Sequence, residues 1–151
     1  MNAPATLDHD GIAARIPHQG RMCLLDRLLD WSSREIRCSA ISHHDPAHPL
    51  RDGAGLSAAC AIEYAAQAMA LHGALNSAAG AQARSGFLAS ARQVRLRAPS
   101  LDDVPGALQV HAELLAGDPR QALYRFTLSD EAGRVLVDGR ATVVLDGALT
   151  P

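Results

Sequence analysis

Apolar and polar residues alternate with a period near two along most of the second half of the chain. A period of two predicts strands with one buried face, and the turn-rich segments PSLDDVPG, GDPRQ and DEAG separate them. Because the connections are short, we expect neighbouring strands to pair antiparallel. The four predicted strands are GFLASARQVRLRAP (86–99), ALQVHAELLAG (107–117), ALYRFTLSD (122–130) and RVLVDGRATVVL (134–145).

One long helix is predicted over residues 56–76, because Ala, Leu, Met, Glu and Gln are strong helix formers. Small residues occupy most of its circumference, which indicates that other structure packs closely around it. The segment SAAGAQARSG (77–86) ends this run.

The pattern of apolar and polar residues before the helix is less regular. The segment EIRCSAIS (35–42) alternates as a strand, whereas the spacing of MCLLDRLLDWS (22–32) suits a helix as well as a buried strand. GIAARI (11–16) is a possible short helix, and we expect residues 1–10 to form a loose, flexible arm. The order of elements predicts a single α+β domain over 1–151, in which one buried helix packs on one antiparallel sheet.

Composition narrows the class of protein. The chain has 151 residues with a net charge of −2, so nothing in it suggests a nucleic-acid partner. Residues 54–75 are interrupted by polar side chains, so they make a poor membrane span. No signal peptide is recognisable, and scattered cysteines without C-x-x-C spacing favour reduced thiols and a cytoplasmic location. The cysteines are Cys23, Cys38 and Cys60.

The predicted helix carries one pair of polar residues that could do chemistry. Glu63 and Gln67 are four residues apart and therefore share a face. They could be an exposed pair on a solvated stripe, but this helix has few other polar residues to form one. If Glu63 faces inward, burial would raise the pKa of its carboxyl and make it a proton donor for general acid–base chemistry.

A histidine-rich loop, HHDPAHPL (43–50), leads into the helix. Three interpretations stay open for His43, His44 and His48. They could bind a metal, although their spacing matches no common zinc pattern; they could be inert surface residues; or one of them could pair with Glu63.

Two further features could contact a substrate. The start of the helix, near residues 55–58, would offer free backbone N–H groups suited to polarising a carbonyl oxygen. Arg95 and Arg97 alternate along one predicted strand, with Arg92 nearby, and could meet a phosphate or an acidic partner. The simpler interpretation of these arginines is a solvated strand face.

Three segments in register resemble the bacterial 3-hydroxyacyl-acyl-carrier-protein dehydratases, over about residues 15–145. The resemblance is closest to a divergent subgroup linked to polyketide and aryl polyene pigment pathways. It implies a hot-dog fold, in which a curved antiparallel sheet wraps a long central helix, and it makes MCLLDRLLDWS a strand. The segments are IPHQGRMCLLDRLLDW (16–31), AIEYAAQAMA (61–70) and GFLASARQVRLRAPSLDDVPGALQV (86–110).

The resemblance also implies a reaction and a site. The family removes water from a 3-hydroxyacyl thioester carried by acyl carrier protein or CoA, without metal or cofactor, at a dimer interface. It uses a loop histidine as base, here His48, and a helix carboxyl from the other subunit, here Glu63. The resemblance implies Gln67 as the neighbour that orients Glu63, and it implies that N–H groups at the start of the helix, near Ala58, hold the thioester carbonyl. Arg95 and Arg97 are also predicted to bind substrate, from their charge and spacing alone.

The loop DPAHPLRDGAGLSA departs from the family's Gly-His-Phe-Pro pattern, and Ser57-Ala58 stands in place of its Pro-Gly. His43 or His44 could therefore replace His48 as the base. Two alternatives to a dehydratase remain: a hot-dog thioesterase in which Glu63 activates water, and a non-catalytic subunit of a dehydratase heterodimer. The dimer itself could be a homodimer or a heterodimer with another hot-dog dehydratase.

Overall fold

The structure is a computed structural model that describes residues 4–77 and 86–145. Within this part of the chain, six strands and one long helix form the framework, supplemented by short helical turns. The helices are α1 (His9–Ala13) and α2 (Ala61–Leu75), and the 3₁₀ turns are η1 (Gly20–Met22), η2 (Ser42–His44) and η3 (Ala58–Cys60). The strands are β1 (Arg27–Trp31), β2 (Glu35–Ala40), β3 (Gly86–Leu96), β4 (Leu108–Gly117), β5 (Gln121–Ser129) and β6 (Val135–Leu145).

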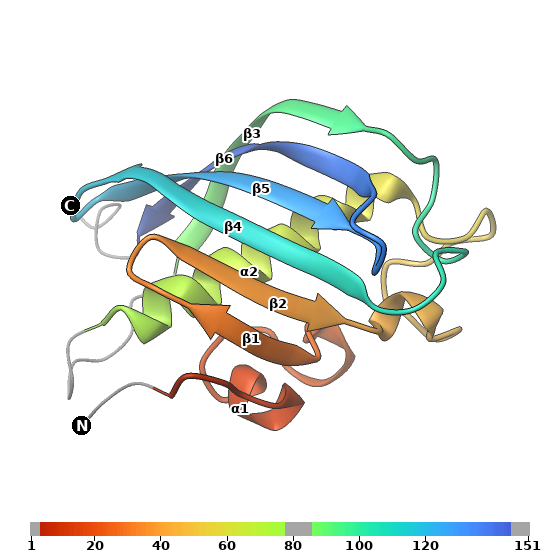
Figure 1. Cartoon of the computed structure of the whole chain (residues 1–151), viewed down its shortest axis with the longest axis horizontal. Coiled ribbons are helices and arrows are strands. Elements are labelled where there is room, and N and C mark those ends of the chain that lie inside the picture. The colour runs from red at the N-terminus through yellow and green to blue at the C-terminus, as the bar shows by residue number, and fades with distance from the viewer. Residues whose placement is uncertain (1–3, 78–85, 146–151) are drawn as a thin grey trace.

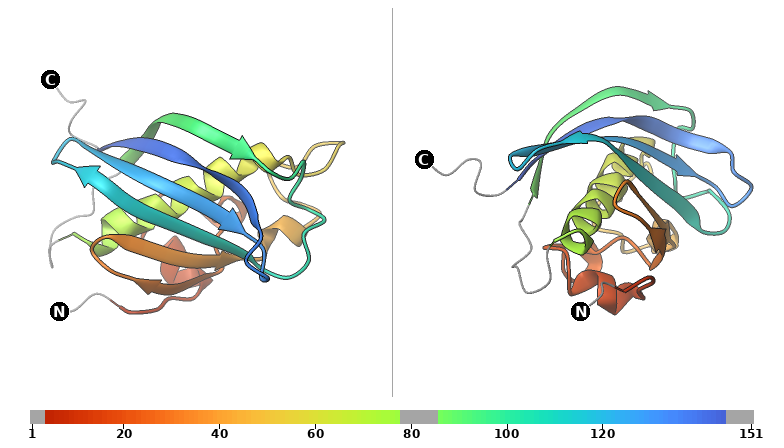
Figure 2. Two further views of the ribbon diagram at one scale, coloured as in Figure 1. Left: turned by 45° about the horizontal axis from the view of Figure 1, so that its top comes forward. Right: turned by 60° about the vertical axis from the view of Figure 1, so that its left-hand side comes forward.

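The strands form a single antiparallel sheet in the order β1-β2-β4-β5-β6-β3. The sheet curves around α2, which lies along its concave side (Figures 1 and 2). Because α2 separates β2 from β3 in the chain, β3 reaches the opposite edge of the sheet and pairs with β6. This is the α+β arrangement that the order of elements predicted and the hot-dog fold that the family resemblance implied.

Helix α2 is buried because its small side chains let the sheet approach closely. Tyr64, Ala68 and Leu71 have no exposed surface, and they pack in one core with apolar residues from the strands. The helix begins at Ala61, five residues later than predicted, because Ala58–Cys60 form the 3₁₀ turn η3 instead. It ends at Leu75, and the segment expected to end it lies mostly outside the described residues.

Strand β1 shows how pairing can override local periodicity. Part of the ambiguous segment 22–32 becomes the strand Arg27–Trp31 because β2 pairs with it, for example through Leu28 and Cys38. The four strands predicted in the second half of the chain, and the one over 35–42, are confirmed within a few residues of their predicted ends.

Residues 4–10, part of the segment expected to be a loose arm, make backbone and side-chain hydrogen bonds in the structure. Leu7 forms an isolated antiparallel bridge with Leu28, and the Trp31 indole N–H donates to the Pro4 carbonyl oxygen at 2.8 Å. Asp8 caps α1 by accepting a hydrogen bond from the Gly11 N–H at 2.9 Å. Backbone pairing and capping thus hold this segment against β1; residues 1–3 lie outside the described part.

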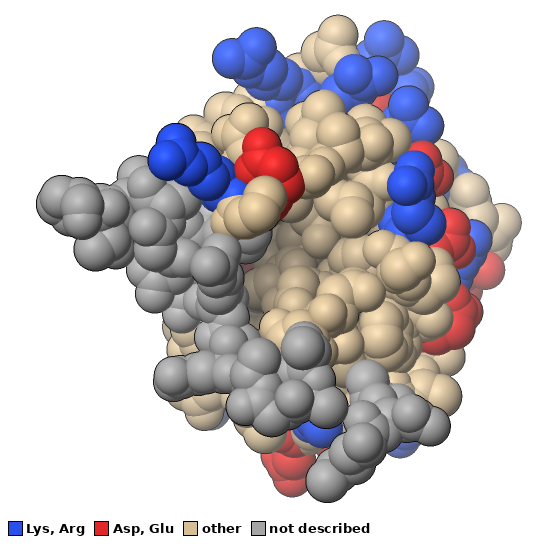
Figure 3. Space-filling model, turned by 90° about the vertical axis from the view of Figure 1, so that its left-hand side faces the viewer, with Lys and Arg blue, Asp and Glu red and all other residues tan. Residues whose placement is uncertain are grey.

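The cysteines and the surface add two observations. Cys23, Cys38 and Cys60 are all free thiols, of which the first two are buried and Cys60 is half-buried. Seen from the end of the sheet that carries the β4–β5 turn, arginine side chains gather toward the top, where β3 and β6 lie (Figure 3). No helix in the described part of the chain is long and apolar enough to cross a membrane.

Candidate functional site

Glu63 lies in the first turn of α2 and contacts a histidine from the N-terminal segment. His18 Nε2 lies 3.1 Å from Glu63 Oε1, and the Gln67 amide donates to the same oxygen at 3.4 Å. The Glu63 and His18 side chains are 32% and 24% exposed, so both are half-buried but reachable. His18 Nδ1 is buried and has no hydrogen-bond partner in the described part of the chain.

Gln67 fixes the position of the segment that carries His18. Its side chain is fully buried, accepts from the Leu24 N–H at 2.8 Å and donates to the Met22 carbonyl oxygen at 2.6 Å. One amide side chain therefore joins α2 to the backbone just after His18. The Gln67 amide thus contacts the peptide backbone as well as Glu63.

The charge state of Glu63 differs from the expectation. Its pKa lies below the ordinary value, chiefly because His18 donates a hydrogen bond to the carboxylate; the Gln67 hydrogen bond acts in the same direction. Burial opposes this shift without reversing it. The prediction of a carboxyl whose pKa is raised by burial is therefore wrong: Glu63 is held as a carboxylate.

His48 belongs to a different, buried hydrogen-bond chain. It is 4% exposed, and its Nδ1 accepts from the Leu50 N–H at 3.0 Å. Its Nε2 therefore carries the proton and donates to the Tyr64 hydroxyl at 3.0 Å. Tyr64 in turn donates to Ser42 Oγ at 2.8 Å, and Ser42 donates to the Leu24 carbonyl oxygen at 2.8 Å.

These hydrogen bonds leave His48 little freedom to act as a base. Both ring nitrogens are engaged, and burial, followed by the nearby Arg51 charge, lowers its pKa. In the described part of the molecule, no hydrogen bond or ion pair joins His48 to Glu63. The resemblance implies that His48 meets Glu63 of a second subunit; within one chain, the histidine beside Glu63 is His18.

The other loop histidines hold a neighbouring loop. His43 Nε2 and His44 Nε2 lie 3.1 and 2.7 Å from the same acceptor, the Val104 carbonyl oxygen. Burial is the main cause that lowers the pKa of His43. No group of three or more potential ligands is arranged to hold a metal in the described residues.

The backbone N–H groups at the start of α2 are used within the chain. Ala58 N–H donates to the Pro99 carbonyl oxygen at 3.2 Å, and Ala59 N–H donates to Ser57 Oγ at 3.2 Å. Cys60 N–H donates to the Ser57 carbonyl oxygen at 3.0 Å. The N–H groups of Ala58, Ala59 and Cys60, expected to be free, therefore have acceptors within the chain in this conformation.

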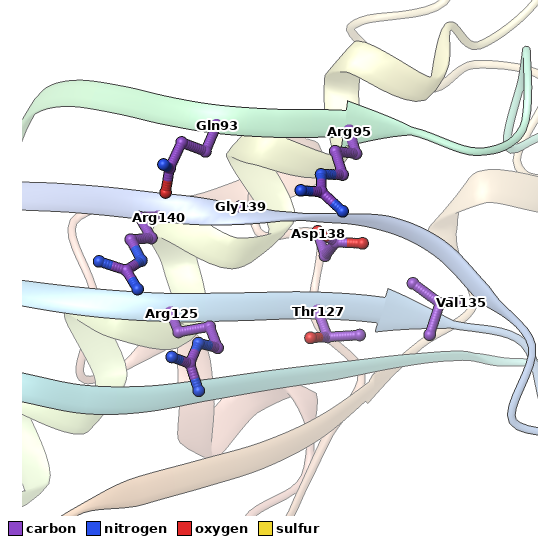
Figure 4. Close-up of a pocket in the computed structure, with 8 residues that line it drawn as sticks. All are labelled: Gln93, Arg95, Arg125, Thr127, Val135, Asp138, Gly139 and Arg140. Atoms are coloured by element: carbon purple, nitrogen blue, oxygen red, sulfur yellow. The ribbon is translucent and has the colours of Figure 1, made fainter.

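Arg95 and Arg97 lie away from Glu63. Arg97 Nε forms an ion pair with Asp138 Oδ2 at 2.8 Å, and Arg95 borders a depression on the side of the sheet that faces away from α2 (Figure 4). The sheet thus separates these arginines from the helix, and they do not join the Glu63 site.

Sequence reasoning missed His18. It stands in IPHQGRM, a segment that carried the family resemblance, but it is far from Glu63 along the chain and no local period links the two. The contact arises because Gln67 docks residues 22–24 onto the helix. A histidine directly after a proline, inside a segment already singled out, was the available signal.

Comparisons with solved structures identify the fold. The structure is similar to the dehydratase heterocomplex ApeI:P from Xenorhabdus doucetiae, with 24% identity over 90% of this chain and 91% of that chain and a TM-score of 0.76. It is also similar to the thioesterase HI1161 from Haemophilus influenzae, with 12% identity over 99% and 98% of the two chains and a TM-score of 0.65. The PaaI protein of the E. coli phenylacetic acid degradation operon matches with 8% identity over 78% and 80% and a TM-score of 0.58. At these identities the likenesses establish the hot-dog fold.

The family follows from the sequence match. The model of the ApeP-like family, described as ApeP dehydratase, matches residues 11–148. The chain therefore belongs to the ApeP-like dehydratase family. No curated protein matches the sequence.

Proposed function

We propose that this protein eliminates water from a 3-hydroxyacyl thioester, with Glu63 and His18 as its acid–base pair. The observation that carries the proposal is the 3.1 Å contact between a half-buried carboxylate and an imidazole in a member of a dehydratase family. Elimination needs one group to take a proton and another to give one, and this pair supplies both.

The proposed reaction uses the Glu63 carboxylate as the base and His18, in its imidazolium form, as the acid. The carboxylate takes the C2 proton, the C2–C3 double bond forms, and the C3–O bond breaks. His18 gives its Nε2 proton to the departing hydroxyl, which leaves as water. Transfer of the proton from Glu63 to His18 then restores the starting state. Gln67 is a positioning residue, because it holds the two elements that carry the pair.

The proposed substrate is carried by acyl carrier protein or CoA, and the proposed partner is a second hot-dog subunit. β3 is an edge strand that pairs with β6 on one side, which leaves its outer edge open to another chain in the described structure. The similar ApeI:P structure is a dehydratase heterocomplex, which supports a heterodimer as well as a homodimer. Native mass spectrometry of the protein, alone and with a co-expressed second hot-dog subunit, distinguishes the two.

The test is dehydration of a 3-hydroxyacyl carrier protein, followed as the loss of one water by intact mass. Glu63→Gln and His18→Asn should each lower the rate by about a hundredfold or more. His48→Asn, if it stays folded, should retain most of the activity. His111→Asn is the matched control, because His111 lies on the outer side of the sheet, 3.8 Å from Glu35.

The reverse pattern, in which His48→Asn abolishes activity and His18→Asn does not, would refute the assignment of His18. A wild-type protein that remains inactive both alone and with a second hot-dog subunit would indicate a non-catalytic role.

Thioester hydrolysis is the second candidate function. It is favoured by one observation: a carboxylate held ionised by His18 could also activate water. Hydrolysis releases a free thiol from acyl-CoA, which a colorimetric thiol reagent detects, whereas dehydration releases none. Thiol release that disappears in Glu63→Gln, without loss of water from the hydroxyacyl substrate, would favour the thioesterase.

A further inference from the structure

The outer side of the sheet carries a row of arginines directly opposite one another. Arg140 on β6 pairs in register with Arg125 on β5 and with Arg92 on β3. Residues that face each other across neighbouring strands point to the same side of the sheet, and like charges in such positions destabilise it. Three adjacent strands therefore hold three positive charges in one line, which costs stability.

Nearby carboxylates do little to balance these charges. Arg125 has one acidic neighbour, Glu113, at 4.0 Å, the outer limit of an ion pair. Asp138 lies in the same region but pairs with Arg97 at 2.8 Å. Within the described part of the chain, Arg92, Arg95 and Arg140 form no ion pair. The local charge is therefore strongly positive in a protein whose net charge is −2.

The arginines surround a depression rather than a flat surface. Arg95, Arg125 and Arg140 line a cavity of about 320 Å³ together with the Gln93 amide, on three strands (Figure 4). The Asp138 carboxylate also lines this cavity, but it pairs with Arg97. An adjoining cavity of about 540 Å³ shares Gln93 and Arg140 and adds Arg92. The groove thus presents guanidinium groups from several directions.

A bulge in β3 builds this groove. Two residues lie between Arg92 and Arg95, whereas one lies between their partners Arg140 and Asp138, so β3 has one extra residue here. The extra residue brings Arg92 and Arg95 to the same side of the sheet, which regular alternation would prevent. Gln93 in the bulge has a φ of 54°, a conformation that costs energy for a residue with a side chain. Such strain in a folded protein often marks a functional site.

We propose that this groove binds the phosphate group of a small molecule, as a monoester or a diphosphate. Arginine forks match phosphate oxygens in pairs, and several arginines converging on a compact concave site fit a small, multiply charged anion. The bound anion would offset the repulsion between these arginines, which destabilises the sheet in its absence. The site is independent of the Glu63 chemistry, because it lies on the opposite side of the sheet from α2.

Calorimetric titration with inorganic pyrophosphate, and separately with glycerol 3-phosphate as a monoester, tests the proposal at fixed ionic strength. Arg140→Gln and Arg125→Gln should each weaken binding by about ten- to a hundredfold, the effect of losing a charge-assisted hydrogen bond. Arg37→Gln is the matched control. Arg37 is an exposed arginine of β2 on the same outer side of the sheet as the groove. Its charge is balanced by Asp30 and Glu35, at 3.9 and 3.7 Å.

A second measurement separates binding from general damage to the fold. Without ligand, Arg140→Gln should raise the melting temperature, because it removes a like-charge contact, and pyrophosphate should stabilise the variant less than the wild type. Absence of binding to wild-type protein, or equal weakening by Arg37→Gln, would overturn the proposal. Tighter binding of poly-glutamate than of either phosphate would overturn it in favour of an acidic protein partner.

Discussion

The replacement of Gln67 by leucine tests how the Glu63 site is held together. Gln67 is fully buried and bridges α2 to the backbone of residues 22–24, accepting from Leu24 N–H and donating to the Met22 carbonyl oxygen. Leucine has similar bulk but can make neither hydrogen bond. The substitution therefore leaves the partner groups in place and removes the link between them, together with the 3.4 Å hydrogen bond from Gln67 to Glu63.

The magnitude follows from these two partners. Leu24 is 1% exposed, so its N–H has little access to water once the amide is gone. A buried group left without a partner costs about 1–3 kcal/mol, and two are affected. The added apolar surface of leucine returns about 1 kcal/mol. We expect the free energy of unfolding to fall by about 1–5 kcal/mol.

Urea denaturation followed by the fluorescence of Trp31, the single tryptophan, measures this change. The matched control is Gln121→Leu at an exposed position on β5, where we expect a change within about 0.5 kcal/mol. A loss below 0.5 kcal/mol in Gln67→Leu would show that the bridge does not hold the segment that carries His18. The dehydration rate should fall as well, because that segment loses its anchor.

Three further predictions concern stability and are measured by urea denaturation. Tyr64→Phe should lower the free energy of unfolding by about 1–3 kcal/mol, because the His48 Nε2–H loses its acceptor; an unchanged value would contradict the hydrogen-bond chain. Burial lowers the pKa of both His48 and His72, so the unfolded chain takes up protons first, and stability should fall as the pH drops below about 7. A flat profile between pH 7 and 5.5 would refute this. Gln93→Gly should raise the free energy of unfolding by about 1 kcal/mol, because glycine adopts a positive φ without strain; a loss would show that the Gln93 side chain stabilises the bulge.

Most secondary structure followed from the sequence because local periodicity decides it. The strands of the second half alternate with period two, and the small helix-forming residues of α2 mark a buried helix. β1 is the exception: the spacing of MCLLDRLLDWS suits two structures, and pairing with β2 selects one. The start of α2 was placed too early because composition does not reveal that Ala58–Cys60 form a 3₁₀ turn.

The bulge in β3 explains why the sequence did not predict which arginines share one side of the sheet. Strict alternation along the strand placed Arg95 and Arg97 on one face, with Arg92 nearby. In the structure Arg97 follows the end of β3 and pairs with Asp138, while the extra residue lets Arg92 join Arg95 on the outer side. Register across three strands, which depends on tertiary pairing, creates the groove.

The candidate site, too, was predictable from the sequence only in part. The sequence by itself determined that Glu63 and Gln67 share a helix face, because the helical repeat fixes their separation. The partner of Glu63 was decided only by tertiary structure, since His18 reaches the carboxylate after residues 22–24 dock on the buried Gln67 amide. His48 lies closer in sequence, but its ring is held by Tyr64 and by its own loop. Local spacing therefore fixed the carboxylate, and long-range hydrogen bonding chose the histidine beside it.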